Sequence, residues 1–584
     1  MIKQLTKSVR EYKLPAILTP ILVAFEVIME VLIPLVTAKL IDEGMYAGNM
    51  NAVYKIGIEL IICALLALIF GAGAGITAAK ASSGFAKNLR KDLYYKVQKF
   101  SFLNIDKFST SSLVTRLTTD VTNVQRTFQM LIRITVRCPL MIAFSLLFAI
   151  KINAKLSYIF LIIVPIVAIG LFFIIKKAYP IMTRVFKKYD ELNNVVEENV
   201  NGIRVVKSFV SEQKENEKFN KVSEEIYKDF SKAEKIIAIN SPILQSAIYI
   251  CMIAISWFGA KIIVNTNMTE LTTGQLMTMF TYTIQILFSL LMLSIVIVMI
   301  TTSRASAKRI VEVLEEESDI KNPENPIYNV KSGEIEFKKV GFSYINKKDK
   351  EVLKNINIKI NSGETVGIIG GTGSSKSSLV NLIPRLYDVI EGEILVGGVN
   401  VKNYDLKTLR NQVACVLQKN ELFSGTIKEN IKWGDENATD EDIVRVCKLA
   451  QADEFIQGFD NKYDTVIEQG GVNVSGGQKQ RLCIARALLK KPQILILDDS
   501  TSAVDTKTDK LIRSAFKQEI PNTTKIIIAQ RISSIEDADK IIVMDNGEIS
   551  AIGTHDDLLS SSNIYKEVYE SQMKGSEIRE WYEK

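Results

Sequence analysis

Long apolar stretches fill the first 303 residues of the chain and constrain its fold more than any other feature. A helix that crosses roughly 30 Å of hydrocarbon needs about 20 mostly apolar residues. Six stretches meet that need: Leu14–Ala38, Leu60–Ala79, Met130–Ile150, Leu156–Ile175, Ile236–Ala260 and Leu271–Ser303. The sequence therefore predicts an α-helical transmembrane domain with six spans, the third of which contains Arg133 and Arg137.

The loops between these stretches predict their orientation. The segment from Lys80 to Arg137 holds eleven Lys or Arg against three Asp, whereas segments 41–55, 151–155 and 261–270 are short and carry few charges. Basic loops stay on the cytoplasmic side of a membrane, so we expect both termini and the two long loops there. The formal charge of +7 is then explained by basic loops that orient the chain in the membrane, and no nucleic acid partner is expected.

Two acidic residues, Glu26 and Glu30, interrupt the first apolar stretch. Four residues apart on a helix, they share one face. Because a carboxylate is expensive to bury in lipid, the pair should face the bundle interior or a wet cavity. Two interpretations remain open: a site for cationic or polar groups of a substrate, or a hydrogen-bonded structural pair with one member protonated.

The second half of the chain has a different pattern. From about Gly333, short strands alternate with helices, as in an α/β domain. Pro323 and Pro326 mark a polar linker before it, and six scattered cysteines suggest neither a disulfide framework nor a zinc site. The expected organisation is a transmembrane domain at 1–316, a linker at 317–332, an α/β domain at 333–570 and a polar tail at 571–584.

A glycine-rich segment follows the expected strand at 364–369 and precedes a helix. This context predicts a phosphate-binding loop, in which Lys376 reaches the β and γ oxygens of ATP and Ser377 ligates Mg²⁺. Ser375 stands where the pattern has its last glycine, a position that can require a glycine-only backbone conformation. The residues expected to contact ATP here are Gly370, Gly371, Thr372, Gly373, Ser374, Ser375, Lys376, Ser377 and Ser378.

Two further motifs complete the expected nucleotide site. An apolar strand at 493–497 ends in Asp498 and Asp499, of which the first can hold Mg²⁺ and the second lies near the attacking water. The segment Ser475, Gly476, Gly477 and Gln478 opens a helix whose first turn exposes N–H groups suited to an anion. Asn546-Gly547 predicts a hairpin between strands at 540–544 and 548–552.

Taken in order along the whole chain, these motifs resemble an ATP-binding cassette (ABC) exporter of the half-transporter type. The most specific mark is VSGGQ, with Ser475 placed 23 residues before Asp498. The resemblance implies a type IV exporter-like six-span domain followed by an α/β P-loop ATP-binding cassette, in the cytoplasmic membrane of a bacterium. It further implies roles for Tyr344 in stacking on adenine, Gln418 in sensing Mg²⁺, Ser502–Asp505 as the D-loop with Asp505 at the nucleotide, and segment 202–209 in docking on the nucleotide domain.

Three positions depart from the family pattern: two concern hydrolysis, and the third, Ser375, concerns nucleotide affinity, which it either reduces or leaves intact. Asp499 replaces the usual glutamate, Gln530 replaces the switch histidine, and Ser375 replaces a glycine. The single histidine, His555, is expected in a helix N-terminal turn capped by Thr554 and cannot take the switch role. A carboxylate set back by about 1 Å can lose on the order of 10²-fold in rate, so this chain's own site should hydrolyse ATP slowly.

The signature segment is intact apart from Val474 in place of leucine. In the family, Walker A of one chain faces the signature of another, so the resemblance implies a heterodimer in which a second, non-identical half transporter supplies the glutamate and histidine. A homodimer, an importer of siderophores or metal chelates, and a silent regulatory subunit are the alternatives. The expected substrates are drugs, lipids or peptides, bound near Thr281, Tyr282, Gln285 and Phe288 unless these residues serve helix packing.

Overall fold

The computed structural model describes residues 1–345, 347–500 and 504–583. The chain divides into two compact units. The first comprises Met1–Lys99 and Phe108–Glu316, and the second comprises Phe100–Lys107 and Glu317–Lys584. Residues 100–107, which the sequence analysis placed in the transmembrane domain, thus belong with the second unit.

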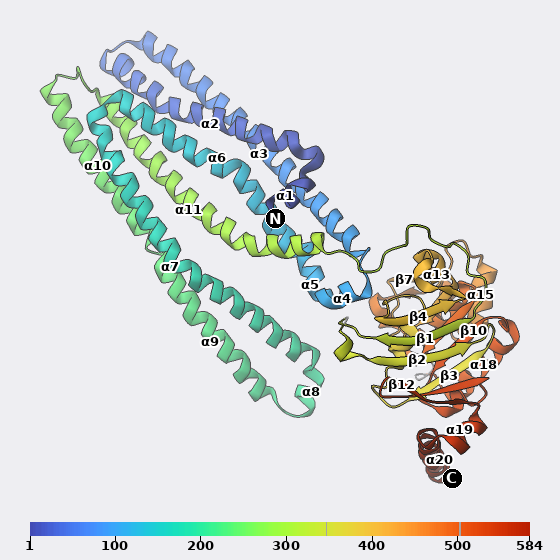
Figure 1. The fold of residues 1–584 in the computed structure, drawn as a ribbon. Helices are drawn as coiled ribbons and strands as arrows, with labels where there is room; N and C mark the ends of the chain where they lie inside the picture. The colour runs from blue at the N-terminus through green and yellow to red at the C-terminus, as the bar shows by residue number, and fades with distance from the viewer. Residues whose placement is uncertain (346, 501–503, 584) are drawn as a thin grey trace. The chain divides into compact units, whose positions relative to one another are not determined.

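The first unit is helical throughout (Figure 1). Its helices are α1 (Ile2–Thr6), α2 (Lys13–Lys39), α3 (Met50–Val97), α5 (Thr110–Thr115), α6 (Val121–Ile152), α7 (Ala154–Asn201), α8 (Ile203–Ser208), α9 (Glu212–Ile237), α10 (Asn240–Asn265) and α11 (Thr273–Glu315). Within the described part of the chain, six helical stretches are long and apolar enough to span a membrane, which confirms the predicted number. The third runs through Arg133 and Arg137 as expected.

Local capping explains where two of the long helices begin. The Asn49 side chain accepts hydrogen bonds from the backbone of Asn51 and Ala52 at 3.1 and 3.2 Å, and α3 starts there. At the start of α11, Thr272 and Gln275 form a reciprocal capping box. Such caps satisfy N–H groups that have no partner within the helix.

Polar side chains of α11 compensate a break in the backbone hydrogen bonds of α2. Pro34 has no N–H to offer the carbonyl of Glu30, one helical turn earlier. Gln285 Nε2 donates to that carbonyl at 3.4 Å, and Tyr282 Oη donates to the neighbouring Val31 carbonyl at 2.8 Å. Tyr282 is fully buried, so it serves packing, whereas Thr281, Gln285 and Phe288 line a cavity.

A buried carboxylate joins the start of α6 to the C-terminal part of α11. Asp120, just before α6, has no exposed surface and accepts two hydrogen bonds from Arg309, one of them from Nε at 2.8 Å. Arg116 Nη1 donates to the Arg309 carbonyl at 2.7 Å and lies 3.4 Å from Glu312. Charge-assisted bonds of this kind hold two helices in one register.

The second unit contains two main sheets. A four-stranded sheet has the order β2-β1-β4-β5, and a six-stranded sheet has the order β12-β11-β3-β10-β9-β6. The strands are β1 (Ile335–Phe342), β2 (Leu353–Ile360), β3 (Thr365–Gly370), β4 (Glu391–Val396), β5 (Val399–Asn400), β6 (Val413–Val416), β9 (Ile494–Asp498), β10 (Thr524–Ile528), β11 (Lys540–Asp545) and β12 (Glu548–Gly553). A short pair, β7 (Gly425–Thr426) and β8 (Val466–Ile467), forms a third sheet.

Helices accompany these strands. They are α4 (Phe102–Phe108), α12 (Lys376–Asn381), α13 (Leu406–Gln412), α14 (Ile427–Lys432), α15 (Asp440–Leu449), α16 (Asp453–Gln457), α17 (Gly476–Leu489), α18 (Thr506–Glu519), α19 (His555–Ser561) and α20 (Asn563–Glu583). The predicted hairpin is confirmed by the antiparallel pairing of β11 with β12. The prediction for His555 is also confirmed, because it begins α19 with Thr554 as the cap. Helix α20 continues through the segment expected to be a polar tail.

The parallel part of the six-stranded sheet positions the expected nucleotide residues. Strand β10 pairs in parallel with both β3 and β9, so the carboxyl ends of all three meet at one edge. Ligands of open α/β sheets bind at this edge. The phosphate loop follows β3, Asp498 ends β9, and Gln530 follows β10.

Prediction for the buried carboxylate: Asp120→Ala should lower the free energy of unfolding by about 1–3 kcal/mol, because it leaves the Arg309 guanidinium without its buried acceptor. A lower thermal unfolding temperature of the purified protein in detergent would report the loss. The control is Glu270→Ala, which breaks an exposed pair with Lys155 at 3.8 Å and should leave that temperature unchanged. An equal unfolding temperature for Asp120→Ala and the parent protein would show that the Asp120–Arg309 contact does not stabilise the fold.

Candidate functional site

The phosphate loop has a strained backbone at Ser375, the position where the family pattern has glycine. Ser375, the residue before α12, has φ 69° and ψ 25°, in the left-handed region. A side chain in this region costs roughly 1–2 kcal/mol relative to glycine. Gly373, two residues earlier, has φ 85°. The serine therefore occupies a backbone position that favours glycine, and the loop keeps its turn despite it.

Lys376 lies over the loop that carries it. Its Nζ donates to the carbonyls of Gly370 and Gly371, both at 2.9 Å, and to Ser374 Oγ at 3.1 Å. Burial lowers the pKa of the Lys376 ammonium, and the nearby Asp498 and Asp499 carboxylates oppose that shift. A Cβ built on Gly371 or Gly373 would meet nothing within 4 Å. The loop thus combines a cation with open space beside its backbone, as a phosphate chain requires.

Two oxygen ligands lie together at the place expected for Mg²⁺. Ser377 Oγ donates to Asp498 Oδ1 at 3.0 Å, and Asp498 is buried at the end of β9. Burial raises the pKa of Asp498, while the hydrogen bond from Ser377 and the Lys376 charge oppose this. The described residues contain no group of three or more His, Cys, Asp or Glu that could hold a metal. The pair fits Mg²⁺, which takes one or two protein ligands together with phosphate oxygens.

Asp499 and Gln530 contact each other directly. Gln530 Nε2 donates to Asp499 Oδ2 at 2.7 Å, and the Asp499 backbone N–H donates to the Ile528 carbonyl at 3.0 Å. Burial raises the pKa of Asp499, and hydrogen bonds from Gln530 and Gln418 oppose that shift. The structure therefore brings all three residues expected to be catalytic, Asp499, Gln530 and Gln418, to one point. One carboxylate oxygen is already bound by an uncharged amide.

A residue that the sequence analysis missed holds the segment after β10. Gln572 of α20 donates from Nε2 to the Gln530 carbonyl at 2.8 Å, and its Oε1 accepts from the Ile532 N–H at 2.9 Å. The two bonds fix the backbone on both sides of Arg531. A single glutamine in a polar helix carries no pattern that could have indicated this role.

Tyr344 lies beside the phosphate loop. Its hydroxyl is 2.8 Å from Ser378 Oγ, and its ring packs edge-on against Phe342 and Tyr387 with centroids 4.8 and 5.1 Å apart. A cavity of about 300 Å³ is lined by Tyr344, Tyr387 and other residues of this region. The position is compatible with the expected contact to adenine.

Residues 100–107 line the same cavity, which the sequence analysis did not anticipate. Leu103 is part of its wall, and Tyr387 Oη donates to Asp106 Oδ2 at 2.9 Å. Asn104 Nδ2 donates to the Glu317 carbonyl at 3.2 Å, and Ser101 Oγ donates to Asp319. The only signal in the sequence was the Ser-x-x-Asn spacing of Ser101 and Asn104, which resembles a helix cap. This segment of the first long loop thus lies next to the expected adenine contact.

The signature segment forms the start of α17. Ser475 is the cap, and it exchanges hydrogen bonds with Gln478 in a capping box. Ser475 and Gly476 are exposed, Gly477 and Gln478 are half-buried, and the first turn contains no acidic residue. The turn can therefore accept an anion from outside the chain. Asp505 caps α18 by accepting from the Thr508 N–H at 2.9 Å, whereas positions 502 and 503 of the expected D-loop lie outside the described residues.

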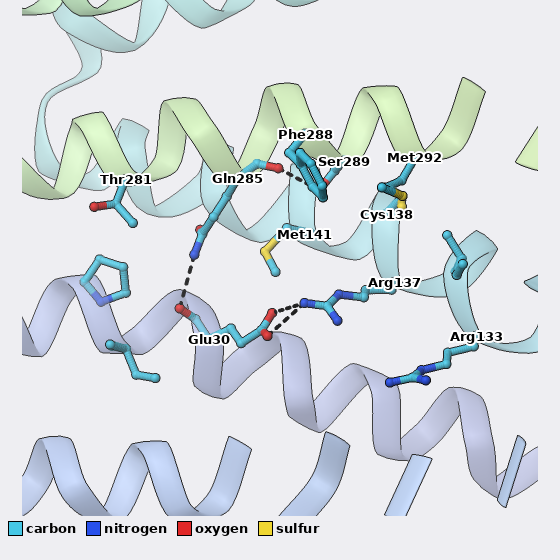
Figure 2. A pocket seen from close by; sticks show the side chains of 13 residues that line it. Glu30, Arg133, Arg137, Cys138, Met141, Thr281, Gln285, Phe288, Ser289 and Met292 are labelled. Atoms are coloured by element: carbon cyan, nitrogen blue, oxygen red, sulfur yellow. Dashed lines mark hydrogen bonds and ion pairs between the residues drawn. The ribbon is translucent and has the colours of Figure 1, made fainter. Parts of the chain in front are cut away.

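In the first unit, Glu26 and Glu30 share one arginine, whose bonds to Glu30 are drawn in Figure 2. Arg137 Nη2 donates to both Glu30 oxygens at 2.8 and 2.6 Å, and Nη1 donates to Glu26 Oε1 at 3.0 Å. Glu30 and Arg137 line a cavity of about 610 Å³ together with the predicted Thr281, Gln285 and Phe288. Sequence reasoning placed the two acids on one face but did not identify Arg137 as their partner.

Both units of the chain match known protein families. Residues 16–306 match the family model of the ABC transporter transmembrane region, and residues 353–502 match that of the ABC transporter. YfiB of Bacillus subtilis, an uncharacterized ABC transporter ATP-binding protein, is 38% identical over 570 residues, 97% of this chain and 98% of its own. YknU of the same organism, also described as an uncharacterized ABC transporter ATP-binding protein, is 34% identical over 487 residues, 83% of each chain.

One solved structure shows the same fold. A bacterial Atm1-family ABC exporter with ATP bound superposes with a TM-score of 0.81 over 97% of this chain and 99% of its own. At 23% sequence identity, this likeness concerns the fold.

Prediction for the segment after β10: Gln572→Ala should raise amide hydrogen exchange of segment 530–532 about fivefold, because a net hydrogen bond contributes about 1 kcal/mol. Hydrogen–deuterium exchange followed by mass spectrometry measures this. Gln457→Ala removes a comparable glutamine, which donates to Asp453 at 3.2 Å, and should leave the segment unchanged. Unaltered exchange in Gln572→Ala would show that α20 does not hold this backbone.

Proposed function

Since the chain belongs to the ABC transporter family as an exporter-type half transporter, we propose that it is the degenerate-site subunit of a heterodimeric exporter. The complex moves hydrophobic or amphipathic molecules such as drugs, lipids or peptides out across a bacterial cytoplasmic membrane and is driven by ATP hydrolysis, with both termini of this chain in the cytoplasm. The observation that carries the proposal is the 2.7 Å hydrogen bond between Gln530 and Asp499.

The residues of the phosphate loop are suited to binding ATP. Bound ATP with Mg²⁺ supplies the phosphate charge that draws two cassettes together in this family. Lys376 offers its ammonium to the phosphates when it leaves the loop carbonyls. Ser377 and Asp498 are placed to hold the cation. Binding therefore depends on groups that this chain retains.

The same site is poorly equipped for hydrolysis. A general base must reach the water it activates, and Asp499 is one methylene shorter than glutamate. Its Oδ2 accepts from the Gln530 amide, which carries no charge to stabilise the transferring phosphoryl group. ATP at this site should therefore remain intact over many turnovers of the complex, which would keep the two cassettes in contact.

The signature supports a complementary role toward a second chain. Its first turn is capped, exposed in part and free of acidic residues. We infer that it completes the site formed by the partner's phosphate loop, where a glutamate and a histidine perform hydrolysis. Defects confined to the hydrolytic residues fit such a division of labour better than a general decay would.

An uncovered apolar surface also supports assembly with another chain. Helix α8 and the residues just after it expose Val205, Phe209 and Val210 by 61, 76 and 82%. Contiguous apolar side chains of this kind usually mark a protein–protein contact. The second long loop, in which they lie, is the one that docks on a nucleotide domain in the family. We propose that this surface contacts the partner's cassette.

Prediction for the composition: a tag on this chain, used to purify the complex from its native membrane, should recover a second, different half transporter in equal amount. Native mass spectrometry gives the mass and the stoichiometry. Two copies of this chain alone would contradict the heterodimer, and Asp499 and Gln530 would then serve both sites.

Prediction for the degenerate site: Asp499→Glu combined with Gln530→His should raise ATP hydrolysis by this chain's site at least about tenfold, because it restores the reach of the base and a chargeable switch residue. The assay uses a complex in which the partner's own glutamate has been replaced by glutamine, so that only this site contributes. The same pair combined with Lys376→Ala is the control and should show no gain. An unchanged rate in the double variant would refute the explanation of slow hydrolysis.

A further inference from the structure

A cavity of about 610 Å³ lies between α2, α6 and α11 (Figure 2). This volume falls in the range of small-molecule sites. Most of its lining is apolar, with Ile33, Ile134, Met141, Phe288 and Met292 among the contributors. Three charged residues also line it: Glu30, Arg133 and Arg137. An apolar wall with a few charges suits an amphipathic ligand.

The polar side chains that α11 contributes are already bonded within the protein. Ser289 Oγ donates to the Gln285 carbonyl at 2.7 Å, and Thr281 Oγ1 donates to the Met277 carbonyl at 3.3 Å. The Gln285 side chain donates from Nε2 to the backbone carbonyl of Glu30 and accepts at Oε1 from Ser145 Oγ. Recognition of a ligand therefore falls to the charged residues.

One side of the cavity carries an excess negative charge. Arg137 is shared between Glu26 and Glu30, and the side chain of Glu26 is only 7% exposed. With both acids ionised, one guanidinium against two carboxylates gives this triad a charge of about −1. Glu30 is the acid of the triad that lines the cavity.

Arg133 provides the opposite charge. It lies one helical turn before Arg137 on α6, and in Figure 2 its guanidinium is separate from the bonded Arg137–Glu30 pair. Among the residues that the structure describes, Arg133 has no ion pair and no hydrogen bond. Helix α3 passes beside this guanidinium, since a Cβ built on Gly75 would lie 3.8 Å from Nη1. An intramembrane guanidinium that no anion contacts directly is costly, so a bound anion would be favoured at this point.

The four charges balance. Glu26 and Glu30 against Arg133 and Arg137 sum to zero, so a ligand with a net charge would unbalance a region of low dielectric. A ligand with an anionic group for Arg133 and a cationic group for the triad would satisfy both ends. A lone cation, one of the ligands considered for the two acids in the sequence analysis, would leave Arg133 without a directly bonded anion.

We propose that this cavity binds a zwitterionic amphiphile, with its anionic group at Arg133, its cationic group toward Glu30 and its apolar body along Met141, Phe288 and Met292. The assignment rests on the proposed export of amphipathic molecules and names the class that this chain recognises.

The test measures equilibrium binding to the intact complex, purified through this chain and held in lipid nanodiscs without nucleotide. Three fluorescent probes share one dansyl-alkyl tail and differ in the headgroup: phosphocholine, a phosphate monoester or trimethylammonium. The phosphocholine probe should bind about tenfold more tightly than either charged probe, the difference expected for one charge-assisted hydrogen bond. Equal affinity of the three probes, or a preference for either charged probe, would overturn the proposal.

Variants locate the interaction. Arg133→Gln should weaken binding of the phosphocholine probe about tenfold, whereas Arg133→Lys should retain most of it and show that the helix still folds. Arg126→Gln is the matched control, because it removes the same charge from an exposed position on α6. Unchanged binding in Arg133→Gln would overturn the assignment. A complex that binds the phosphocholine probe as expected but does not move it outward with ATP would contradict the export function and leave the binding site standing.

Discussion

Hydrocarbon offers no water to polar groups, and this constraint shapes the membrane-spanning unit. The carbonyl that Pro34 leaves without a donor receives one from Gln285, and Tyr282 and Thr278 serve neighbouring carbonyls of α2. These three side chains all come from α11, so satisfying the backbone of one helix also fixes its neighbour. The two acids of α2 are bonded in the same way to Arg137 of α6. Internal bonding of this kind orders the three helices that surround the cavity.

The second unit depends on the parallel pairing of β3, β10 and β9. Their common edge brings the phosphate loop, Asp498 and Gln530 together although they are far apart in the sequence. At this edge the residues expected to bind ATP are suitably placed, whereas those expected to hydrolyse it are not. Lys376, Ser377 and Asp498 have the contacts that ATP with Mg²⁺ would use, whereas Asp499 is short and bonded to an uncharged amide. These contacts are the grounds on which we propose a site that binds ATP well and hydrolyses it slowly.

Much of this organisation could be predicted from the sequence, because it depends on local patterns. Apolar length indicated the six spans, and glycine-rich turns after buried strands indicated the ATP site. The hairpin at Asn546-Gly547 and the helix start at His555 followed from the same short-range chemistry. The contacts that escaped prediction join distant segments. Arg137 lies over a hundred residues from the acids it binds, and Gln572 and residues 101–106 reach their partners only in the folded chain.

We expect ATP to stay intact at this chain's site while the complex hydrolyses ATP at the other site. A photoreactive azido-ATP labelled on the γ-phosphate tests it most directly, when the complex turns over the nucleotide and is then cross-linked by light. The γ-label should be recovered mainly on this chain's phosphate loop, with little on the partner. Equal loss of the γ-label from both chains would mean that Asp499 and Gln530 support hydrolysis, and the division of labour would be wrong.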